Sequence, residues 1–365
     1  MINNIKNKIM NKLKVVFGSY LIHNGLLPKV KIGKYIIPFQ IKYIFKIPIP
    51  IPFWYFSLFS TPGNSIKRKH YAIRDKLENN SIKRKELEKI YEKYMGFRPN
   101  FDNPVMFTEK LNYLKLNYEN HLITKCCDKF TVKEYITQYI GEKYMVPNIN
   151  NWNDIGKINF DELPNKFVLK VNWSSGYNIL INNKQDIKKS EWNLIIKQLD
   201  LWMKPESNSY YDAFNWGYKD MMPVIFAEEY LDIPNNSTEY KVFCFNGKVK
   251  FVLVELDYFG KKPKRAYYNK EWQEMPFQFG NIEKVKIDNP PETYNKIIEL
   301  AERLAKPFPY IRVDFYDIKG NLYIGEMTFY SGGGFSKIKP YDYDVELGKD
   351  LDLTEAMEKV KKGVL

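Results

Sequence analysis

The pattern of apolar and polar positions indicates a mixed chain of helices and strands from about residue 100 onward. Apolar residues at helical spacing predict helices at roughly 107–117, 128–140, 190–203 and 292–306. Runs of β-branched and aromatic residues predict strands at 167–171, 179–181, 224–229, 240–245, 249–255, 311–316 and 322–328. Asn246-Gly247 predicts a type I′ hairpin turn, and Asp317-Ile-Lys-Gly320 predicts a second hairpin. The predicted fold class is therefore α+β with antiparallel hairpins.

The N-terminal quarter has a different pattern. The first twenty residues have Ile and Leu at helical spacing with lysines between them, which predicts a basic amphipathic helix. An apolar stretch at 36–60 follows, and its prolines and lysines interrupt it too often for a membrane-spanning helix. It also lacks the small-residue cleavage site of a signal peptide. A charged helix is predicted next, at about 65–95.

The positive charge of the chain is concentrated in this same quarter. The net charge is +13, and residues 1–100 hold 20 Lys/Arg against 5 Asp/Glu, whereas the remainder holds 36 against 38. A basic segment with interleaved aromatics is typical of contact with an anionic membrane surface, here through residues 1–60. Packing on the main domain or on a partner subunit is an equal alternative. No recognition motif accompanies the charge, so we expect no nucleic-acid partner.

Histidine and cysteine usage narrows the chemistry. All three His lie in the first third of the chain, which argues against a His-based triad or a His-rich metal site in the main domain. The three Cys (Cys126, Cys127 and Cys244) form no C-x-x-C motif, so we expect neither a zinc site nor a disulfide scaffold. This usage favours a cytoplasmic location, and the basic segment allows a peripheral one on the inner face of the membrane.

The strongest chemical signal lies on the predicted hairpin at 311–328. Alternation places Arg312 and Asp314 on one face of its first strand, and Glu326 and Thr328 on one face of its second. Two carboxylates brought this close need a cation, and ligands that are all oxygen favour Mg²⁺. Magnesium held by few carboxylates usually completes its shell with substrate phosphates. The alternative is an exposed hairpin face with alternating charges and no bound metal.

Several further segments, taken in order, resemble a known family. The segments are Phe107–Leu111, Cys127–Lys129, Lys166–Lys170 with Ser175-Gly176, Ala227–Leu231, Tyr240–Gly247, Arg312–Tyr316 and Gly325–Phe329. Together, from Asn103 to Asp352, the chain resembles the ATP-grasp amidoligases of the teichuronopeptide-biosynthesis type, which occur in bacterial surface-polysaccharide loci. The resemblance implies an ATP-grasp fold, in which two α+β subdomains grip ATP. We expect residues 101–365 to form the catalytic region, with a lid subdomain at about 165–230 and a metal-binding subdomain at about 231–350, after an N-terminal extension at 1–100.

The resemblance also implies roles for individual residues. The cofactors are ATP and Mg²⁺, and the metal ligands are Asp314, Glu326 and Thr328. Arg312 and Lys241 are the catalytic cations. The nucleotide-binding residues are Lys129 and Lys170 at the inner phosphates, Ser174, Ser175 and Gly176 in a loop over the triphosphate, Glu228, Glu229, Tyr230 and Leu231 in the adenine hinge, and Glu239 at the ribose.

Two positions depart from the family pattern. Thr328 stands where Asn is usual, and the phosphate loop reads Asn-Trp-Ser-Ser-Gly where Asn-His-Gly-Ser-Gly is expected. Trp173 and Ser174 should therefore stiffen a loop that is normally glycine-rich.

The resemblance implies a reaction that phosphorylates a carboxylate and joins it to an amine. The carboxylate partner would be a uronic acid of a glycan or nucleotide sugar, and the amine would be an amino acid or a small amine. One alternative is a glycosyltransferase that uses Asp342-Tyr-Asp344 as a metal-binding D-x-D motif. Another is a non-catalytic, membrane-associated nucleotide-binding assembly protein. The oligomeric state stays open.

Overall fold

A computed structural model describes residues 30–32, 35–37, 80–234, 237–256 and 263–364. The amphipathic helix predicted in the first twenty residues lies outside these ranges, as does most of the apolar stretch at 36–60. Two short strands, β1 (Val30–Ile32) and β2 (Tyr35–Ile37), pair as an antiparallel hairpin. Of the charged helix predicted at about 65–95, the described part is α4 (Asn80–Met95). In the described residues, no helix is both long and apolar enough to cross a membrane.

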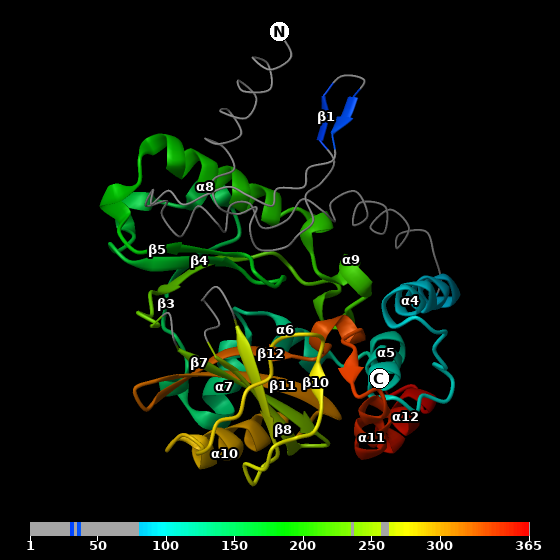
Figure 1. The fold of residues 1–365 in the computed structure, drawn as a ribbon. Coiled ribbons are helices and arrows are strands. Elements are labelled where there is room, and N and C mark those ends of the chain that lie inside the picture. Colours follow the sequence, from blue (N-terminus) through cyan, green and yellow to red (C-terminus); the bar gives the residue numbers. More distant parts are fainter. Residues whose placement is uncertain (1–29, 33–34, 38–79, 235–236, 257–262, 365) are drawn as a thin grey trace.

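Two antiparallel sheets form the framework (Figure 1). The smaller sheet has the order β3-β6-β4-β5 and the larger has the order β12-β11-β7-β8-β9. The smaller sheet is built from β3 (Asn148–Trp152), β4 (Phe167–Val171), β5 (Asn178–Ile181) and β6 (Ile225–Glu229). The larger is built from β7 (Thr238–Phe245), β8 (Lys248–Leu256), β9 (Lys264–Tyr268), β11 (Tyr310–Ile318) and β12 (Asn321–Thr328). A two-stranded pair joins β10 (Gln278–Phe279) to β13 (Ile338–Lys339).

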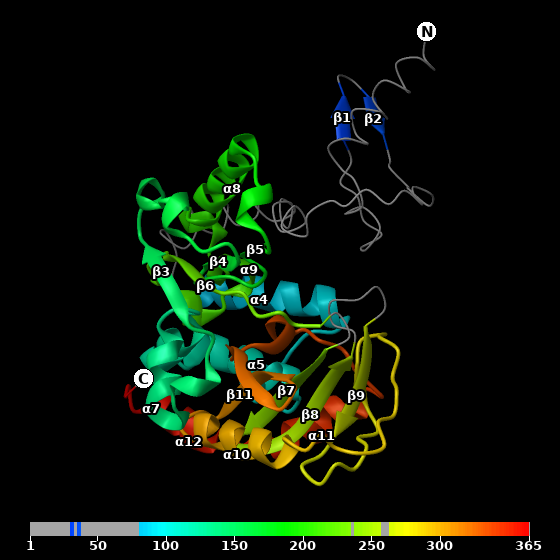
Figure 2. The same cartoon turned by 90° about the vertical axis from the view of Figure 1, so that its left-hand side faces the viewer.

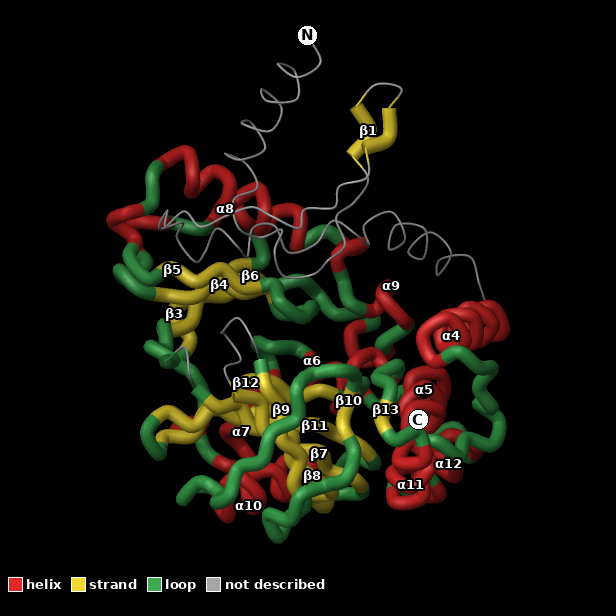
Figure 3. Tube along the Cα trace, viewed as in Figure 1, coloured by secondary structure: helices red, strands yellow, loops and turns green. Residues whose placement is uncertain are grey.

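The two sheets lie one above the other, and helices cover the outer face of each (Figure 2). Helix α8 (Lys189–Trp202) lies over the smaller sheet, followed by the short α9 (Tyr210–Ala213). Helix α10 (Tyr294–Ala305) packs on β7, β8 and β11 of the larger sheet. The remaining helices are α5 (Phe107–Asn117), α6 (His121–Cys127), α7 (Val132–Ile140), α11 (Asp342–Asp350) and α12 (Thr354–Lys361), and Figure 3 distinguishes them from the strands by colour.

Burial on both faces explains why the strands of the larger sheet are so apolar. Seven of the eight residues of β7 are buried, because α10 covers one face, and aromatic side chains together with the ion pairs of Lys241 fill the other. Helix α10 contributes Ile297, Leu300, Ala301 and Leu304, which follow the spacing of one helical face and are 0% exposed. The predicted strands and helices from residue 107 onward match the observed ones closely. The observed α+β architecture, with its antiparallel sheets, also agrees with the predicted fold class.

Both predicted hairpins are present. Asn246 and Gly247 have φ of 49° and 77°, as a type I′ turn requires. Gly247 has a second constraint, since a Cβ there would lie 3.2 Å from the Lys306 Cα. In the second hairpin the turn residues are Lys319 and Gly320, also with positive φ. This hairpin pairs Arg312 with Thr328 and Asp314 with Glu326.

Asp342 and Asp344 do not form a metal-binding pair in this fold. They lie in the first turn of α11 rather than after an apolar strand, and Asp342 is exposed. Asp344 is 1% exposed and accepts hydrogen bonds from the Thr108 backbone N–H (2.9 Å) and hydroxyl (2.6 Å). It therefore satisfies a first-turn donor of α5, which would otherwise lack an intrahelical partner. This structural role removes the basis for the D-x-D interpretation.

The Asp344 carboxyl should make stability depend on pH. Burial raises its pKa to about 6 from 3.8, against the opposing effect of its Thr108 hydrogen bonds. The folded state holds this proton more tightly than the unfolded state does. The stabilisation that the Asp344 carboxyl contributes is therefore complete below pH 4 and is lost as the pH rises through 6. We expect Asp344→Asn to remove roughly 2–3 kcal/mol of that pH dependence. Urea unfolding of both proteins at pH 4, 5, 6 and 7 measures it, and parallel stability curves would contradict the assignment.

Candidate active site

A buried carboxylate on the smaller sheet gathers two lysines from separate elements. Glu228, at the end of β6, is 4% exposed and forms ion pairs with Lys133 of α7 (2.6 Å) and with Lys170 of β4. Burial alone would raise the Glu228 pKa, but the two lysines outweigh burial and lower it. The carboxylate is therefore ionised, and it holds both ammonium groups at the edge of the sheet.

Lys133 is one of the residues whose role the sequence did not reveal. As an isolated helical lysine it reads as a solvated surface residue, but its side chain is only 15% exposed. It also donates a hydrogen bond to the Val146 carbonyl at 2.7 Å, and burial lowers its pKa. The local pattern could not indicate this pairing, because the partner Glu228 comes from a strand far along the chain.

Lys129 connects this lysine group to the phosphate loop. Its ammonium group donates to the Ser174 carbonyl at 2.5 Å, and its backbone N–H donates to the Asn172 carbonyl at 3.2 Å. Burial lowers the Lys129 pKa, the Glu326 carboxylate opposes that effect, and the positive charge of Lys170 adds to it. Lys170 of the smaller sheet and Glu326 of the larger one therefore both act electrostatically on Lys129.

The phosphate loop is fixed at one end and exposed at the other. The Trp173 indole is 3% exposed and donates to the Trp202 carbonyl at 2.8 Å. The Ser174 hydroxyl is 1% exposed and lies 2.6 Å from that of Ser209. Ser175 and Gly176 are exposed, and Gly176 has φ of 76°. Only the tip of the loop thus presents backbone and hydroxyl groups to solvent.

Asn172 and Asp128 join the start of this loop to α7. The Asn172 amide donates to the Asp128 carboxylate at 2.7 Å and to the Met222 carbonyl at 2.9 Å. The other Asp128 oxygen accepts from the Phe130 backbone N–H at 2.7 Å. Burial raises the Asp128 pKa, although these hydrogen bonds oppose it. This junction fixes the position of the segment that carries Lys129.

A second charge group lies across four strands of the larger sheet, and Lys241 is at its centre. Lys241 is paired with Asp314 in the β7–β11 register. Its ammonium group forms ion pairs with Glu239, with Glu255 (3.4 Å) and with Asp314 (3.6 Å).

Two arginines complete this charge group. The Arg312 guanidinium donates to both oxygens of Asp314 at 2.6 Å, and Arg265 of β9 donates to Glu255 at 2.8 Å. The carboxylate positions Glu239 and Glu255 face one another across β7 and β8, a repulsive pairing that Lys241 compensates.

The charges of this group shift one another's pKa values. Burial, then the negative charge of Asp314, raise the Glu239 pKa to about 7, while Lys241 opposes the rise. For Arg312, burial acts to lower the pKa, but Asp314 and Glu326 outweigh it and raise it. Arg312 is therefore a permanent cation. Glu239, which the resemblance assigns to the ribose, is 3% exposed and hydrogen-bonded to Lys241 in this structure.

The residues expected to bind Mg²⁺ are brought together by the β11–β12 hairpin. Asp314 is 2% exposed, and Glu326 lies opposite it. The Thr328 hydroxyl is buried and has no hydrogen-bond partner, which is unusual for a buried polar group. Two carboxylates and an unsatisfied hydroxyl suit a hard, oxygen-seeking cation. Within the described part of the chain, no three His, Cys, Asp or Glu side chains form a metal cluster, so phosphate oxygens and water would have to complete such a shell.

The predicted adenine hinge is only partly buried. Glu229 is exposed, and Tyr230 and Leu231 are half-buried at the end of β6. The Glu229 backbone N–H donates to the Pro147 carbonyl at 3.1 Å, and the Lys166 ammonium group lies 5.7 Å from the centre of the Tyr230 ring. These residues adjoin the Glu228 lysine group, while Arg312 and Lys241 belong to the other sheet.

Other participants were not evident from the sequence. Glu255 and Arg265 belong to the Lys241 group, and nothing in their local pattern marks them. Tyr218 is buried, and its pKa is raised first by burial and then by neighbouring groups that include Cys127 and the Glu326 carboxylate. Only the alternating register of β7 and β8 could have indicated that Glu255 shares a face with Lys241.

The chain is similar to several solved structures at low sequence identity. None of the curated protein sequences matches this chain. Among solved structures, the chain is similar to D-alanine–D-alanine ligase from Bacillus anthracis, with 17% identity, a TM-score of 0.38, and coverage of 69% of this chain and 76% of that one. The ATP complex of that ligase gives 18% identity and a TM-score of 0.33, with 56% of this chain covering 55% of that chain. The ATP-grasp ligase PsnB, in complex with its minimal precursor, Mg and ADP, gives 12% identity and a TM-score of 0.35, with 67% and 62% covered.

The family profile is the decisive comparison. The TupA-like ATPgrasp family matches residues 109–352, which include both sheets, the loop at 172–176 and the β11–β12 hairpin. That range is well over half of the chain. The chain therefore belongs to the TupA-like ATPgrasp family.

Proposed function

We propose that the protein is an ATP- and Mg²⁺-dependent carboxylate–amine ligase that forms ADP. The observation that carries the proposal is the meeting of two charge groups from different sheets. Lys170 belongs to the smaller sheet, and Lys129 lies between α6 and α7, where Glu326 of the larger sheet acts electrostatically on it. A triphosphate held between them would meet cations at both ends, an arrangement that suits phosphoryl transfer. Membership of the ATP-grasp family supports the same reaction class.

Different residues of this chain bind different phosphates of ATP. Lys129 and Lys170 hold the inner phosphates, and the exposed loop tip at Ser175 and Gly176 covers them. Arg312, which is ionised at any physiological pH, and Lys241 stabilise the negative charge that develops on the transferred phosphoryl group. The hinge at 228–231 receives the adenine, and Glu239 is the candidate for the ribose hydroxyls.

Asp314, Glu326 and Thr328 are the residues that would hold the metal. When bound, Mg²⁺ would neutralise phosphate charge during transfer. Asp314 already accepts from Arg312 and faces Lys241, so it would share its oxygens between these cations and the metal. The unsatisfied Thr328 hydroxyl supports its inclusion in the ligand set.

We propose that the carboxylate is a uronic acid of a surface glycan or nucleotide sugar, and that the amine is an amino acid or a small amine. The setting would be capsule or cell-wall polysaccharide synthesis on the cytoplasmic side. A second candidate is a nucleotide-binding assembly protein without turnover. The anchoring of Trp173 and Ser174 favours this candidate, because a fixed loop closes less readily over a triphosphate. ATP consumption screened against a panel of uronates and amines separates the two.

Glu326→Gln is expected to abolish turnover while the fold stays intact. Removing one of the two hairpin carboxylates leaves the triphosphate charge uncompensated, which should cost several kcal/mol of transition-state stabilisation. ADP release measures the effect, and circular dichroism measures the fold. Asp342→Asn is the matched control, since Asp342 is an exposed carboxylate outside the site and its loss should leave turnover unchanged. Near-normal activity of Glu326→Gln would contradict the metal assignment.

The products should be ADP and phosphate, with an acyl phosphate as the intermediate. Arg312, Lys241 and the hairpin carboxylates surround the expected terminal phosphate, so charge stabilisation is directed at γ-phosphoryl transfer. Hydroxylamine in place of the amine should then trap one hydroxamate for each ADP released. AMP as the nucleotide product would overturn this mechanism, and UDP released without ATP consumption would favour a glycosyltransferase.

The N-terminal segment should bind anionic vesicles, and deletion of residues 1–60 should release the protein into the soluble fraction. This stretch lies almost entirely outside the described residues, and the proposal rests on its basic and aromatic sequence. Each Lys or Arg near an anionic surface contributes roughly 1 kcal/mol, which salt screens. Co-sedimentation with phosphatidylserine vesicles at low and high salt tests it. Absence of binding at low salt would indicate a packing element or subunit interface instead.

A further inference from the structure

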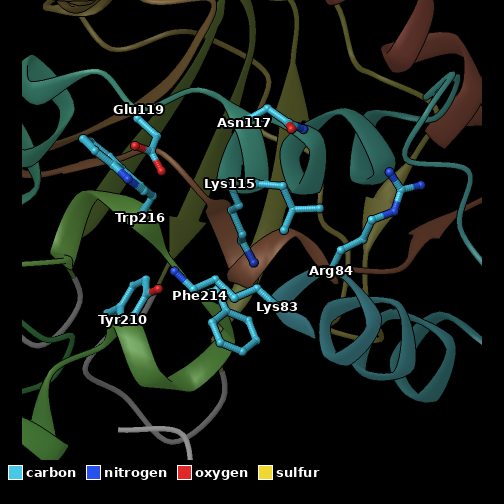
Figure 4. Close-up of a pocket in the computed structure, with 9 residues that line it drawn as sticks. Lys83, Arg84, Lys115, Asn117, Glu119, Tyr210, Phe214 and Trp216 are labelled. Carbon is cyan, nitrogen blue, oxygen red and sulfur yellow. The ribbon is translucent and has the colours of Figure 1, made fainter. Parts of the chain in front are cut away.

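A cavity beside the active site is lined by residues to which no role has yet been given. Its volume is about 260 Å³, and it lies between α4, α5 and the segment that follows α9 (Figure 4). The lining residues are Lys83, Arg84, Lys115, Leu116, Asn117, Glu119, Tyr210, Phe214 and Trp216. A cavity of this size is slightly below the roughly 300 Å³ at which drug-sized sites begin, and it suits a single sugar or amino-acid unit.

Two short segments connect this cavity to the magnesium hairpin. The Lys115 ammonium group donates to the carbonyl of Gly333, in the turn η8 (Ser331–Gly334) that follows β12. On the opposite wall, Trp216 begins the turn η7 (Trp216–Tyr218), whose Tyr218 lies within the electrostatic influence of Glu326 and Arg312. The cavity therefore adjoins the place where the terminal phosphate is expected, and the adenine hinge contacts other elements.

The charge of the lining selects an anionic ligand. Among the described residues, three basic side chains line the cavity against one acidic side chain, Glu119. The Arg84 guanidinium is held by Asp102 at 2.7 Å and by Glu88 at 3.0 Å, and it points away from the cavity in Figure 4. The ammonium ends of Lys83 and Lys115 point inward. A positively charged amine would meet repulsion here, so the cavity suits the acid partner of the ligase.

The remaining walls are aromatic. Tyr210, Phe214 and Trp216 are less than 10% exposed, and they lie on two sides of the lysine ammonium groups (Figure 4). Aromatic faces present flat apolar surface to a ring, while their edges and polar atoms leave room for hydroxyl groups. Phe214 adopts a left-handed backbone (φ 56°), a conformation that costs a non-glycine residue energy and often marks a binding site.

An independent observation indicates a missing hydrogen-bond acceptor. The Trp216 indole N–H is buried and has no partner, although buried indole groups usually find one. Trp216 lines the cavity, so a ligand hydroxyl or carboxylate oxygen placed there would satisfy this donor. Glu119, on the same wall, could accept from a ligand hydroxyl.

We propose that this cavity binds the acid substrate, and that this substrate is an acidic sugar. The sugar ring lies against Tyr210, Phe214 and Trp216, and its carboxylate lies at Lys83 and Lys115. That the bound acid is a substrate rests on the proposed ligase function, whereas its binding in the cavity does not. An acidic amino acid is the less suitable ligand, because its ammonium group would face the lysines.

Equilibrium binding without ATP tests the proposal on the full chain. The probes are D-glucuronate, D-glucose and L-glutamate, measured by titration calorimetry. We expect saturable binding of glucuronate and at least tenfold weaker binding of the other two. Lys83→Gln should weaken glucuronate binding at least tenfold, and Trp216→Phe, which keeps the ring but removes the indole N–H, should weaken it several-fold.

The control variant is Lys85→Gln, which removes an equivalent charge from an exposed position of the same helix and should leave binding unchanged. Melting temperatures and ATP affinity verify that each variant is folded. Absence of glucuronate binding, unchanged binding in both Lys83→Gln and Trp216→Phe, or tighter binding of glutamate would overturn the proposal. Glucuronate binding without ATP turnover would leave the cavity assignment standing and reject the ligase. Ligase activity on glucuronate, with wild-type glucuronate affinity in both variants, would support the ligase function and reject the cavity assignment.

Discussion

Compensation of buried charge is the constraint on which this site depends. Arg312, Lys241 and Arg265 alternate with Asp314, Glu239 and Glu255 across four strands of the larger sheet. Three cations balance three carboxylates, so the strands can bury them together, whereas any one charge alone would be costly to bury. Removal of one partner leaves its neighbour uncompensated, and the register of the whole sheet is therefore tied to the chemistry it carries.

Buried charge is also compensated on the smaller sheet, but there cations outnumber carboxylates. There one carboxylate, Glu228, holds two lysines, and Lys129 adds a third positive charge close to Lys170. The excess of positive charge on this side and the carboxylates of the hairpin opposite it together suit a polyanion with a bound divalent cation. The loop at 172–176 modifies this picture, because Trp173 and Ser174 are anchored to Trp202 and Ser209, and only the tip of the loop remains exposed.

Much of the fold could be predicted from the sequence because its signals are local. The hairpin turns at Asn246-Gly247 and Lys319-Gly320 and the face of α10 are encoded by neighbouring residues. The pairing of Asp314 with Glu326 needs more than the turn, because a register shift between Asp314 and Phe315 brings Glu326, rather than Gly325, opposite Asp314. Strand β3 was missed because Asn148–Trp152 is a polar edge strand with little apolar alternation, and the seven-residue α6 is too short for a clear period. The contacts of Lys133 and Asn172 could not be predicted, since each joins segments that are distant in sequence. The roles of the site residues at the nucleotide and the metal remain proposals.

The junction of Asn172 with Asp128 has a consequence for motion. It fastens the root of the phosphate loop to the start of α7, and Lys129 next to it reaches the Ser174 carbonyl. These hydrogen bonds hold the loop, Lys129 and the segment before α7 in fixed relative positions. Helix α7 also packs on α10 of the larger sheet, where the Tyr135 hydroxyl donates to the Leu304 carbonyl. The loop on the smaller sheet is therefore tied to an element of the larger one, and the two cannot separate at this point without breaking the Asn172–Asp128 and Lys129–Ser174 hydrogen bonds.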